Sequence, residues 1–283
     1  MFLLRLASLA FFAYNGLVQT NPLKTIPHTL RWTRSSYFLM SAFAATLLLI
    51  VVVWWPLVVE NVGYIDPDRP WWEQVDWLLI GILATMSLLI MAGADFKADA
   101  LIILVGTFGG LAIESWGTQT QLWMYFTLER PPLWIIPAWP IASLSIDRLT
   151  RWLNHLVIPN SGRFSFAYWF LFTAFFAIML AFIWPTADKS LTLMALALCA
   201  LLIFSPTDHR MAVLTFIAGS ALGYFLERWG TTRECWTYYT RQTPPLFAVL
   251  AHGMAAVAFW RAGLLVKQFQ VRLLAIARPS SAR

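Results

Sequence analysis

The sequence has few charged residues and almost no cysteine. Charged side chains make up 12% of its 283 residues, whereas a soluble domain carries roughly 25%. Cys199 falls in an apolar run and Cys235 in a loop, so the pair indicates neither a disulfide framework nor a metal-thiolate site. The sequence also lacks a histidine cluster, a P-loop, a dinucleotide fingerprint and a serine elbow. These absences exclude the enzyme classes that depend on those motifs, and we expect no cofactor and no metal ion.

Hydrophobic residues are abundant instead. They make up 59% of the chain, and the mean hydropathy is +0.65. The 16 tryptophans are typical of side chains that anchor a protein at membrane interfaces. The net charge is +6, but the basic residues lie in short loops between apolar runs, which argues against a nucleic-acid partner. The sequence therefore predicts a polytopic membrane protein of the all-α class, with the bilayer as its solvent.

Eight apolar runs are long enough, or nearly so, to cross a membrane, which needs about 20 residues of helix. The predicted spans are 37–59, 77–93, 98–117, 133–150, 164–184, 189–205, 210–229 and 245–266. Residues 2–18 form a further short run that Arg5 and Asn15 interrupt. It is either a marginal ninth span or an interfacial helix, so the prediction is eight or nine transmembrane helices.

Loop charges indicate the orientation of these spans. The segment 19–36, the loop 148–163 and the tail 267–283 are basic, whereas the loop 60–76 is acidic. Basic loops lie mainly on the cytoplasmic side. One orientation satisfies all four segments, and it places the C-terminus in the cytoplasm. We expect an integral membrane protein of a bacterial inner membrane.

The stretch from Gly106 to Trp139 occurs twice. It recurs without a gap 113 residues later, from Gly219 to His252, and 17 of 54 aligned positions are identical between 95–148 and 208–261. The identical residues include glycines, a glutamate, aromatic residues and a Pro-Pro pair. Identity at such residues indicates that both copies form a site of defined geometry, and that they share more than a hydrophobic pattern.

The repeat predicts how the chain is organised. Residues 1–36 precede a first four-helix repeat at 37–150, a second repeat occupies 164–266, and residues 267–283 form a basic cytoplasmic tail. Four spans per repeat give both halves the same orientation. We therefore expect parallel repeats related by a pseudo-twofold axis along the membrane normal.

Each repeat places two glycines and a glutamate on one helix face, since Gly106, Gly110 and Glu114 are spaced by four. Glu227 is the second glutamate. We expect the two glycine-bearing helices to pack near the axis, so that the acids approach each other or face one cavity. A carboxylate inside a membrane is costly, which favours catalysis or ligand binding. The alternative is structural: each acid accepts hydrogen bonds from the following loop and holds it.

Aromatic residues and one histidine complete the candidate site. Trp139 of the first copy is replaced by His252 in the second, which favours one asymmetric site; His252 is a candidate proton carrier or a structural residue. Gly117 is expected to end its helix. Asp95 and Arg148, with their copies Asp208 and Arg261, are expected to form structural ion pairs or to act as orientation signals. The candidate substrate-binding residues, which are alternatively interface anchors, are Trp116, Trp123, Tyr125, Trp139, Trp229, Trp236 and Tyr238.

These residues resemble the motif of the membrane-bound carotenoid hydratase family. Glu114, Gly117, Thr118, Trp123, Tyr125, Pro137 and Trp139 follow the order of that motif, and the second copy repeats its first part. Met124 and Thr237 stand where the family has glycine, and the family's glycine before the proline segment is missing. The resemblance covers about 35 residues per half. It implies an enzyme that adds water across a double bond of a long isoprenoid.

Three functions follow from these features. The first is an integral-membrane enzyme that acts on a lipid or isoprenoid, with Glu114, Glu227 and His252 as catalytic residues. The second is a transporter or channel for a small solute or proton, and the third is an assembly or scaffold protein. The expected partners are a lipid substrate and the bilayer, and a homo-oligomer is compatible with the sequence.

Overall fold

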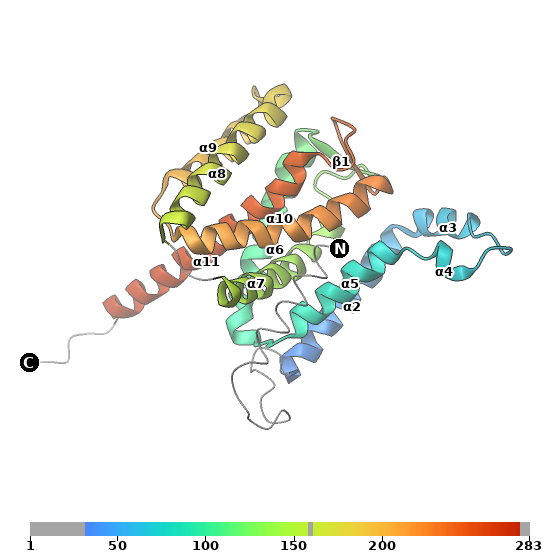
Figure 1. Ribbon diagram of the computed structural model, residues 1–283, viewed down its shortest axis with the longest axis horizontal. Helices are drawn as coiled ribbons and strands as arrows, with labels where there is room; N and C mark the ends of the chain where they lie inside the picture. Colours follow the sequence, from blue (N-terminus) through green and yellow to red (C-terminus); the bar gives the residue numbers. More distant parts are fainter. Residues whose placement is uncertain (1–31, 158–160, 278–283) are drawn as a thin grey trace, which may run out of the picture.

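The computed structural model describes residues 32–157 and 161–277, and in this part of the chain nearly every element is a helix (Figure 1). The all-α prediction is confirmed. The elements are α2 (Arg34–Val53), α3 (Trp55–Gly63), α4 (Trp71–Gln74), α5 (Trp77–Met91), α6 (Phe96–Gln119), β1 (Trp123–Tyr125), η2 (Leu133–Ile135), α7 (Ala138–Leu156), α8 (Ser161–Ile183), η3 (Trp184–Thr186), α9 (Ser190–Phe204), α10 (His209–Thr232), β2 (Trp236–Tyr238) and α11 (Leu246–Ala277). The predicted run 2–18 lies outside the described residues.

Five helices are long and apolar enough to cross a membrane, as an integral membrane protein requires. They are Arg34–Val53, Phe96–Gln119, Ser161–Thr186, His209–Thr232 and Leu246–Gln270. The helices α5 and α9 are apolar but have only 15 residues, which is roughly 22 Å of helix against a hydrocarbon core of about 30 Å.

The predicted span 133–150 differs most from the structure. It begins as the short helix η2, and α7 starts only at Ala138. The helix α7 is not among the candidate membrane spans, because its second half carries Asp147, Arg148 and Arg151.

The predicted span 37–59 is divided at Trp54, where α2 ends and α3 begins with a proline in its first turn. A proline there loses no intrahelical hydrogen bond, so it is compatible with a new helix start. The acidic segment 60–76, predicted as a loop, contains the end of α3 and the short helix α4. Both helices project from the body of the molecule (Figure 1).

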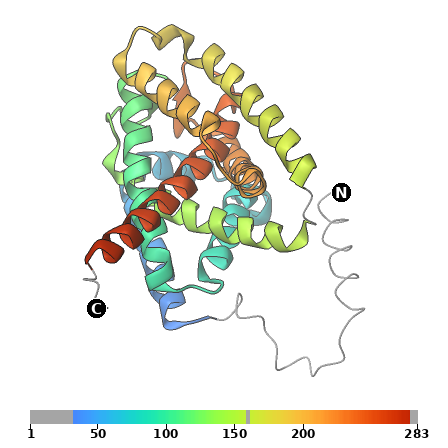
Figure 2. The ribbon, with the colours of Figure 1, turned by 90° about the vertical axis from the view of Figure 1, so that its left-hand side faces the viewer.

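Four helices form the centre of the molecule. The helix α6 packs on α7 and α11, and α10 packs on α11 and α7. The neighbouring helices α8 and α9 lie on one side of this group, and α2 and α5 lie on the other (Figures 1 and 2). The repeated segments are therefore central, and the less similar helices surround them.

The ends of α5 and α9 are held by two equivalent arginines. Arg148 donates to the carbonyl of Ala92 at 3.1 Å and pairs with buried Asp99 at 2.5 Å. Arg261 donates to the carbonyl of Leu202 and to Ser205 at the end of α9. Arginine side chains satisfy the free carbonyls that a helix leaves at its C-terminus.

Two equivalent aspartates start the helices that follow. Asp95 caps the N-terminus of α6 and Asp208 caps that of α10, each by accepting backbone N–H groups of its own first turn. Asp95 therefore acts within its own helix, and the buried ion pair of Arg148 is made with Asp99.

Candidate active site

Glu114 and Glu227 come from α6 and α10, and glycines let a neighbouring helix approach each of them. A Cβ atom on Gly106 would lie 3.0 Å from the Cα atom of Pro140 on α7, and one on Gly219 would lie 2.8 Å from the backbone of α11. The glycine faces therefore receive the next helix of the same half. This differs from the expectation that α6 and α10 pack on each other, since their principal neighbours are α7 and α11.

Glu114 is buried and accepts three hydrogen bonds from aromatic side chains. Trp123 Nε1 donates to Oε2 at 3.1 Å, while Tyr125 Oη and Trp139 Nε1 donate to Oε1 at 2.9 and 3.2 Å. Only 3% of Glu114 is exposed. An indole N–H can only donate, so these contacts fix the carboxyl oxygens as acceptors.

Glu227 has the same environment 113 residues later. Trp236 Nε1 donates to Oε2 at 2.9 Å, and Tyr238 Oη donates to Oε1 at 2.8 Å. The third partner is His252, whose Nε2 lies 2.9 Å from Oε1. We call the three partners of each glutamate its donor cage. The two cages differ only in that an imidazole replaces an indole.

Gly117 and Gly230 have a different role from the one predicted. Both lie inside their helices, which continue for two more residues. A Cβ atom on Gly117 would lie 1.9 Å from the ring of Trp123, and one on Gly230 would lie 1.9 Å from the ring of Trp236. The left-handed turn comes later, at Gln121 with φ of 64° and at its counterpart. Glycine is required here because the indole that donates to the glutamate rests on the helix.

A short antiparallel pairing joins the two cages. Trp123 faces Tyr238, and Tyr125 faces Trp236, across strands β1 and β2. In both facing pairs the ring centroids are 5.9 Å apart. Each strand therefore supplies two donors to its own glutamate and packs them against the donors of the other half.

Both glutamates line one cavity of about 790 Å³. All six side chains of the donor cages line it too, and the rest of its wall is mostly apolar and comes from α2, α5, α8, α9 and α11. Among the residues that the structure describes, the wall includes no lysine or arginine. The site therefore holds two carboxyl groups in one largely apolar space, and the imidazole of His252 is the one nitrogen base among the described residues of its wall.

The candidate residues Trp116 and Trp229 also line the cavity, but their N–H groups point to other partners. Trp116 donates to Thr192 at 3.3 Å, at the start of α9, and Trp229 donates to Asp76 at 2.7 Å, at the start of α5. Asp76 is the N-cap residue of α5. Each tryptophan thus fastens a short helix of the opposite half to the site, which the sequence did not predict because the two acceptors are unlike residues.

Trp54 is a cavity residue that sequence reasoning missed. It stacks on Trp229 with ring centroids 5.8 Å apart and planes 13° apart. It looked like an ordinary residue of the run 37–59. The signal was Pro56, which marks the helix break that turns Trp54 toward the second half.

The tyrosines of the cages remain hydrogen-bond donors over a wide pH range. Burial, and then the charge of Glu114, raises the pKa of Tyr125 well above its ordinary value. Burial and Glu227 do the same for the pKa of Tyr238. The hydroxyl groups therefore stay protonated and keep the loops attached to the glutamates.

The comparisons with known proteins do not assign a function to the site, which is therefore interpreted from its geometry. None of the protein-family models, curated proteins or solved structures compared with the chain matches it. Within the described residues, no group of three His, Cys, Asp or Glu side chains is arranged to hold a metal ion. The hydrogen bonds of the donor cages are what a structural role of Glu114 and Glu227 requires. The cavity that both glutamates line is what a ligand-binding role requires.

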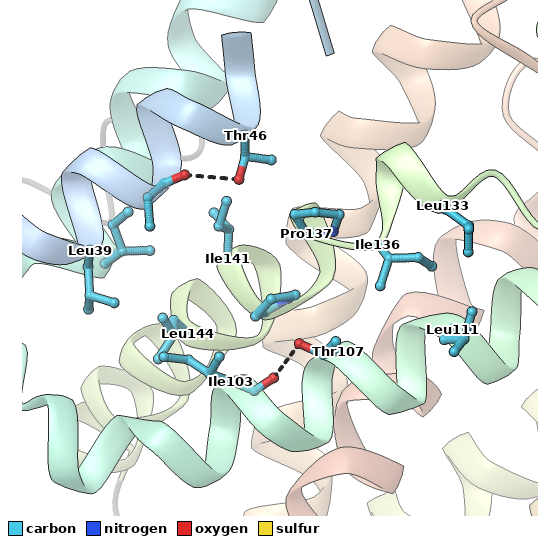
Figure 3. Close-up of a pocket in the computed structure, with 13 residues that line it drawn as sticks. Leu39, Thr46, Ile103, Thr107, Leu111, Leu133, Ile136, Pro137, Ile141 and Leu144 are labelled. Atoms are coloured by element: carbon cyan, nitrogen blue, oxygen red, sulfur yellow. Dashed lines mark hydrogen bonds between the residues drawn. The ribbon is translucent and has the colours of Figure 1, made fainter. Parts of the chain in front are cut away.

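A second, smaller hollow lies between α2, α6 and α7 and has a volume of about 450 Å³ (Figure 3). Thr46 donates to the carbonyl of Ala42 at 2.9 Å, and Thr107 donates to the carbonyl of Ile103 at 2.8 Å. The described residues of its wall include no titratable side chain. It is therefore separate from the candidate chemistry.

Proposed function

We propose that the chain is an integral-membrane enzyme that carries out acid–base chemistry at a double bond of a long lipid or isoprenoid. Hydration, as in carotenoid biosynthesis, is the reaction that the sequence resemblance favours. The observation that carries the proposal is the pair Glu114 and Glu227 in one apolar cavity, whose described wall holds no lysine or arginine and has His252 beside Glu227. Such a site is complementary to positive charge that develops on an otherwise apolar ligand.

Protonation of an alkene creates that positive charge. The proton adds to one carbon and leaves a carbocation on the other. Aromatic faces attract cations, and Trp123, Tyr125, Trp236 and Tyr238 surround the carboxyl groups. An aromatic cavity also excludes bulk water, which would otherwise weaken these electrostatic interactions.

The difference between the cages assigns the roles. An imidazole can bind and release a proton, whereas an indole cannot, so we assign proton delivery to Glu227 with His252 as its proton source. Water then adds to the carbocation. Glu114 accepts the proton that this water releases, so that alkene and water give an alcohol. Water that enters the cavity between turnovers carries the proton from Glu114 back to His252, and the cycle needs only water as a co-reactant.

The proposed architecture follows the sequence repeat. It has eight or nine transmembrane helices in two parallel repeats around a pseudo-twofold axis along the membrane normal. The equivalent donor cages of Glu114 and Glu227 support this arrangement. In the proposed orientation the protein lies in a bacterial inner membrane with its C-terminus in the cytoplasm, and the substrate reaches the site from the lipid phase.

The test compares lipid extracts from cells with and without the gene, followed by turnover of the affected lipid by purified protein in nanodiscs. Glutamine keeps the shape of glutamate but places an amide N–H group against one of the cage donors. We therefore expect Glu227→Gln and Glu114→Gln to fold with lower stability and to abolish the product. If both variants made as much product as the wild type, the assigned catalytic roles would be excluded and the structural role of the glutamates favoured.

The transporter alternative predicts a different result. Two carboxyl groups within aromatic walls also suit an organic cation, so proteoliposomes should be tested for uptake of a tetraalkylammonium ion. Uptake that depends on Glu114 and Glu227, without any lipid product, would replace the enzyme assignment. Neither uptake nor product, together with a co-purifying protein, would favour the scaffold function.

A further inference from the structure

One face of α11 is lined by small residues along most of its membrane-spanning length. These residues recur every three or four positions and all line the cavity of the glutamates; they are Ala248, Ala251, Ala255, Ala258 and Ala262. Leu265 continues the row. From Ala251, which is beside His252, to Leu265 the row is roughly 21 Å long, at 1.5 Å per residue. It leads away from His252, which lies on the same helix.

The helix α9 forms the opposite wall. Leu191, Met194, Leu198 and Leu202 line the same cavity. The helix α9 packs on α8 and α6 but scarcely on α11, so these side chains do not close the space between the two helices. At the inner end, Arg261 donates to the carbonyl of Leu202 and so ties α11 to the end of α9.

The first half does not keep this space. The α7 residues that correspond to Ala258, Ala262 and Leu265 are Ser145, Leu149 and Trp152, so two of the three positions carry a larger side chain. The helices α5 and α7, which are the first-half counterparts of α9 and α11, also pack together directly, unlike α9 and α11. Only the second half, which contains His252, combines a narrow alanine wall with an open partner helix.

A separate observation indicates a ligand in this cavity. Trp54 lines it and is only 7% exposed, yet its indole N–H has no acceptor among the described residues. A buried donor without an acceptor is unfavourable. The N–H has almost no accessible surface, so an oxygen atom on a bound molecule would satisfy it once the indole turns toward the cavity.

We propose that the space between α9 and α11 is a channel for the tail of a linear hydrocarbon chain, whose reactive end lies at the glutamates and Trp54 and carries a hydroxyl group after hydration. This inference rests on the proposed function, because it places the reactive end at Glu227. The channel is longer than half the thickness of the hydrocarbon core, which is about 30 Å. Its occupant is thus longer than a lipid tail that ends at the midplane. Leu201 and Leu265, at the inner end, are 65% and 63% exposed, so the channel opens sideways to lipid there.

The test uses two photoreactive probes and the full-length chain in nanodiscs. Both probes are linear alcohols about as long as the channel, with a diazirine either next to the hydroxyl group or at the far end of the chain. We expect the first to label residues of the donor cages and the second to label α9 and α11 near Leu201 and Ala262. Terminal labelling on α2 and α5, near Leu47 and Leu83, would overturn the channel.

Matched variants of α11 test which residues define the channel. Ala258→Phe fills the channel and should lower terminal labelling roughly tenfold, because the added ring overpacks the space that the chain would occupy. Leu264→Phe lies on the same helix outside the cavity wall and should leave labelling unchanged. If the terminal probe labels Ala258→Phe and Leu264→Phe to the same extent, the channel is contradicted. If Ala258→Phe does not fold, the positions that the terminal probe labels in the wild-type protein decide the question.

The labelling result is independent of catalysis. Labelling in the channel without lipid turnover would keep the binding site and reject the proposed reaction. Specific labelling of the donor cages with the tail elsewhere would keep the site and reject the channel. Failure of both probes to label the cavity would reject the channel and remove the support for a lipid substrate.

Discussion

The imidazole of His252 stacks on the indole of Trp139, with ring centroids 5.9 Å apart and planes 19° apart. Each ring contacts the glutamate of its own half through a nitrogen atom. The stacked pair is therefore the place where the equivalent cages meet and where their chemistry differs. One ring is a fixed donor and the other can gain or lose a proton.

Replacing His252 by tryptophan should separate structure from chemistry. The variant keeps an N–H donor for Glu227, and Gly223 leaves room beneath it as Gly110 does beneath Trp139. We expect its thermal unfolding midpoint to stay close to that of the wild type. Product formation should fall about 10²- to 10⁴-fold, because general acid–base catalysis is lost. Lipid turnover in nanodiscs measures the second effect.

The reciprocal substitution Trp139→His is the control for that experiment. It leaves the pair of Glu227 and His252 intact, so activity should persist. A His252→Trp variant with wild-type activity would contradict the assignment of the proton source, whatever the stability of the variant.

The glycines beneath the cage tryptophans should tolerate no side chain. In Gly230→Ala the new methyl group would lie 1.9 Å from the ring of Trp236, so the indole must move away from Glu227. We expect a loss of roughly 1–3 kcal/mol of unfolding free energy from overpacking, and a further loss from the broken hydrogen bond. Denaturant unfolding followed by tryptophan fluorescence provides the measurement.

Gly81→Ala is the matched control. Gly81 lies within α5, and no other atom lies within 4 Å of its added Cβ. Alanine should stabilise the helix there by roughly 0.5–1 kcal/mol. If Gly230→Ala behaved like Gly81→Ala, the indole would not rest on the helix as described.

Sequence reasoning located the candidate site because the repeat keeps like residues in like environments. Glu114 and Glu227, with the aromatic residues that follow them, could be selected because both copies carry them, and the structure gives both the same contacts. Helical segments could also be predicted from the sequence, since apolar runs such as 98–117 correspond closely to helices such as α6. Hydrophobic length is a local property, and the sequence states it directly.

The contacts between the halves could not be read in the same way. Trp229 reaches Asp76, whereas Trp116 reaches Thr192, so the repeat gives no matched pair to recognise. The pairing of Trp123 with Tyr238 joins two three-residue strands in segments that look like loops. Such contacts depend on how α6 and α10 are placed by α7 and α11, which hydrophobic periodicity does not encode.

Breaking the buried ion pair of Arg148 and Asp99 should destabilise the protein strongly. Their side chains are 8% and 2% exposed, and the closest nitrogen–oxygen distance is 2.5 Å. Arg148→Met leaves the Asp99 carboxylate buried without its partner, at a cost of roughly 3–5 kcal/mol. The double variant with Asp99→Leu removes the unpaired charge, so it should recover part of that loss. Urea unfolding of the single and double variants would show additive losses if the two residues were not coupled.

Cys235 should make the protein less stable in alkali. Burial raises the pKa of its thiol from 9.0 to about 12. The folded protein therefore keeps a proton that the unfolded chain releases once the pH exceeds 9.0, and stability falls by up to about 1.4 kcal/mol per pH unit in that window. Below pH 9.0 both states hold the proton and this contribution is constant.

Unfolding free energies measured from neutral pH to pH about 11 should decline less steeply in Cys235→Ala. Some decline should remain, because the pKa values of Tyr125 and Tyr238 are raised as well. Identical slopes for wild type and variant would mean that the thiol is not buried in the folded loop.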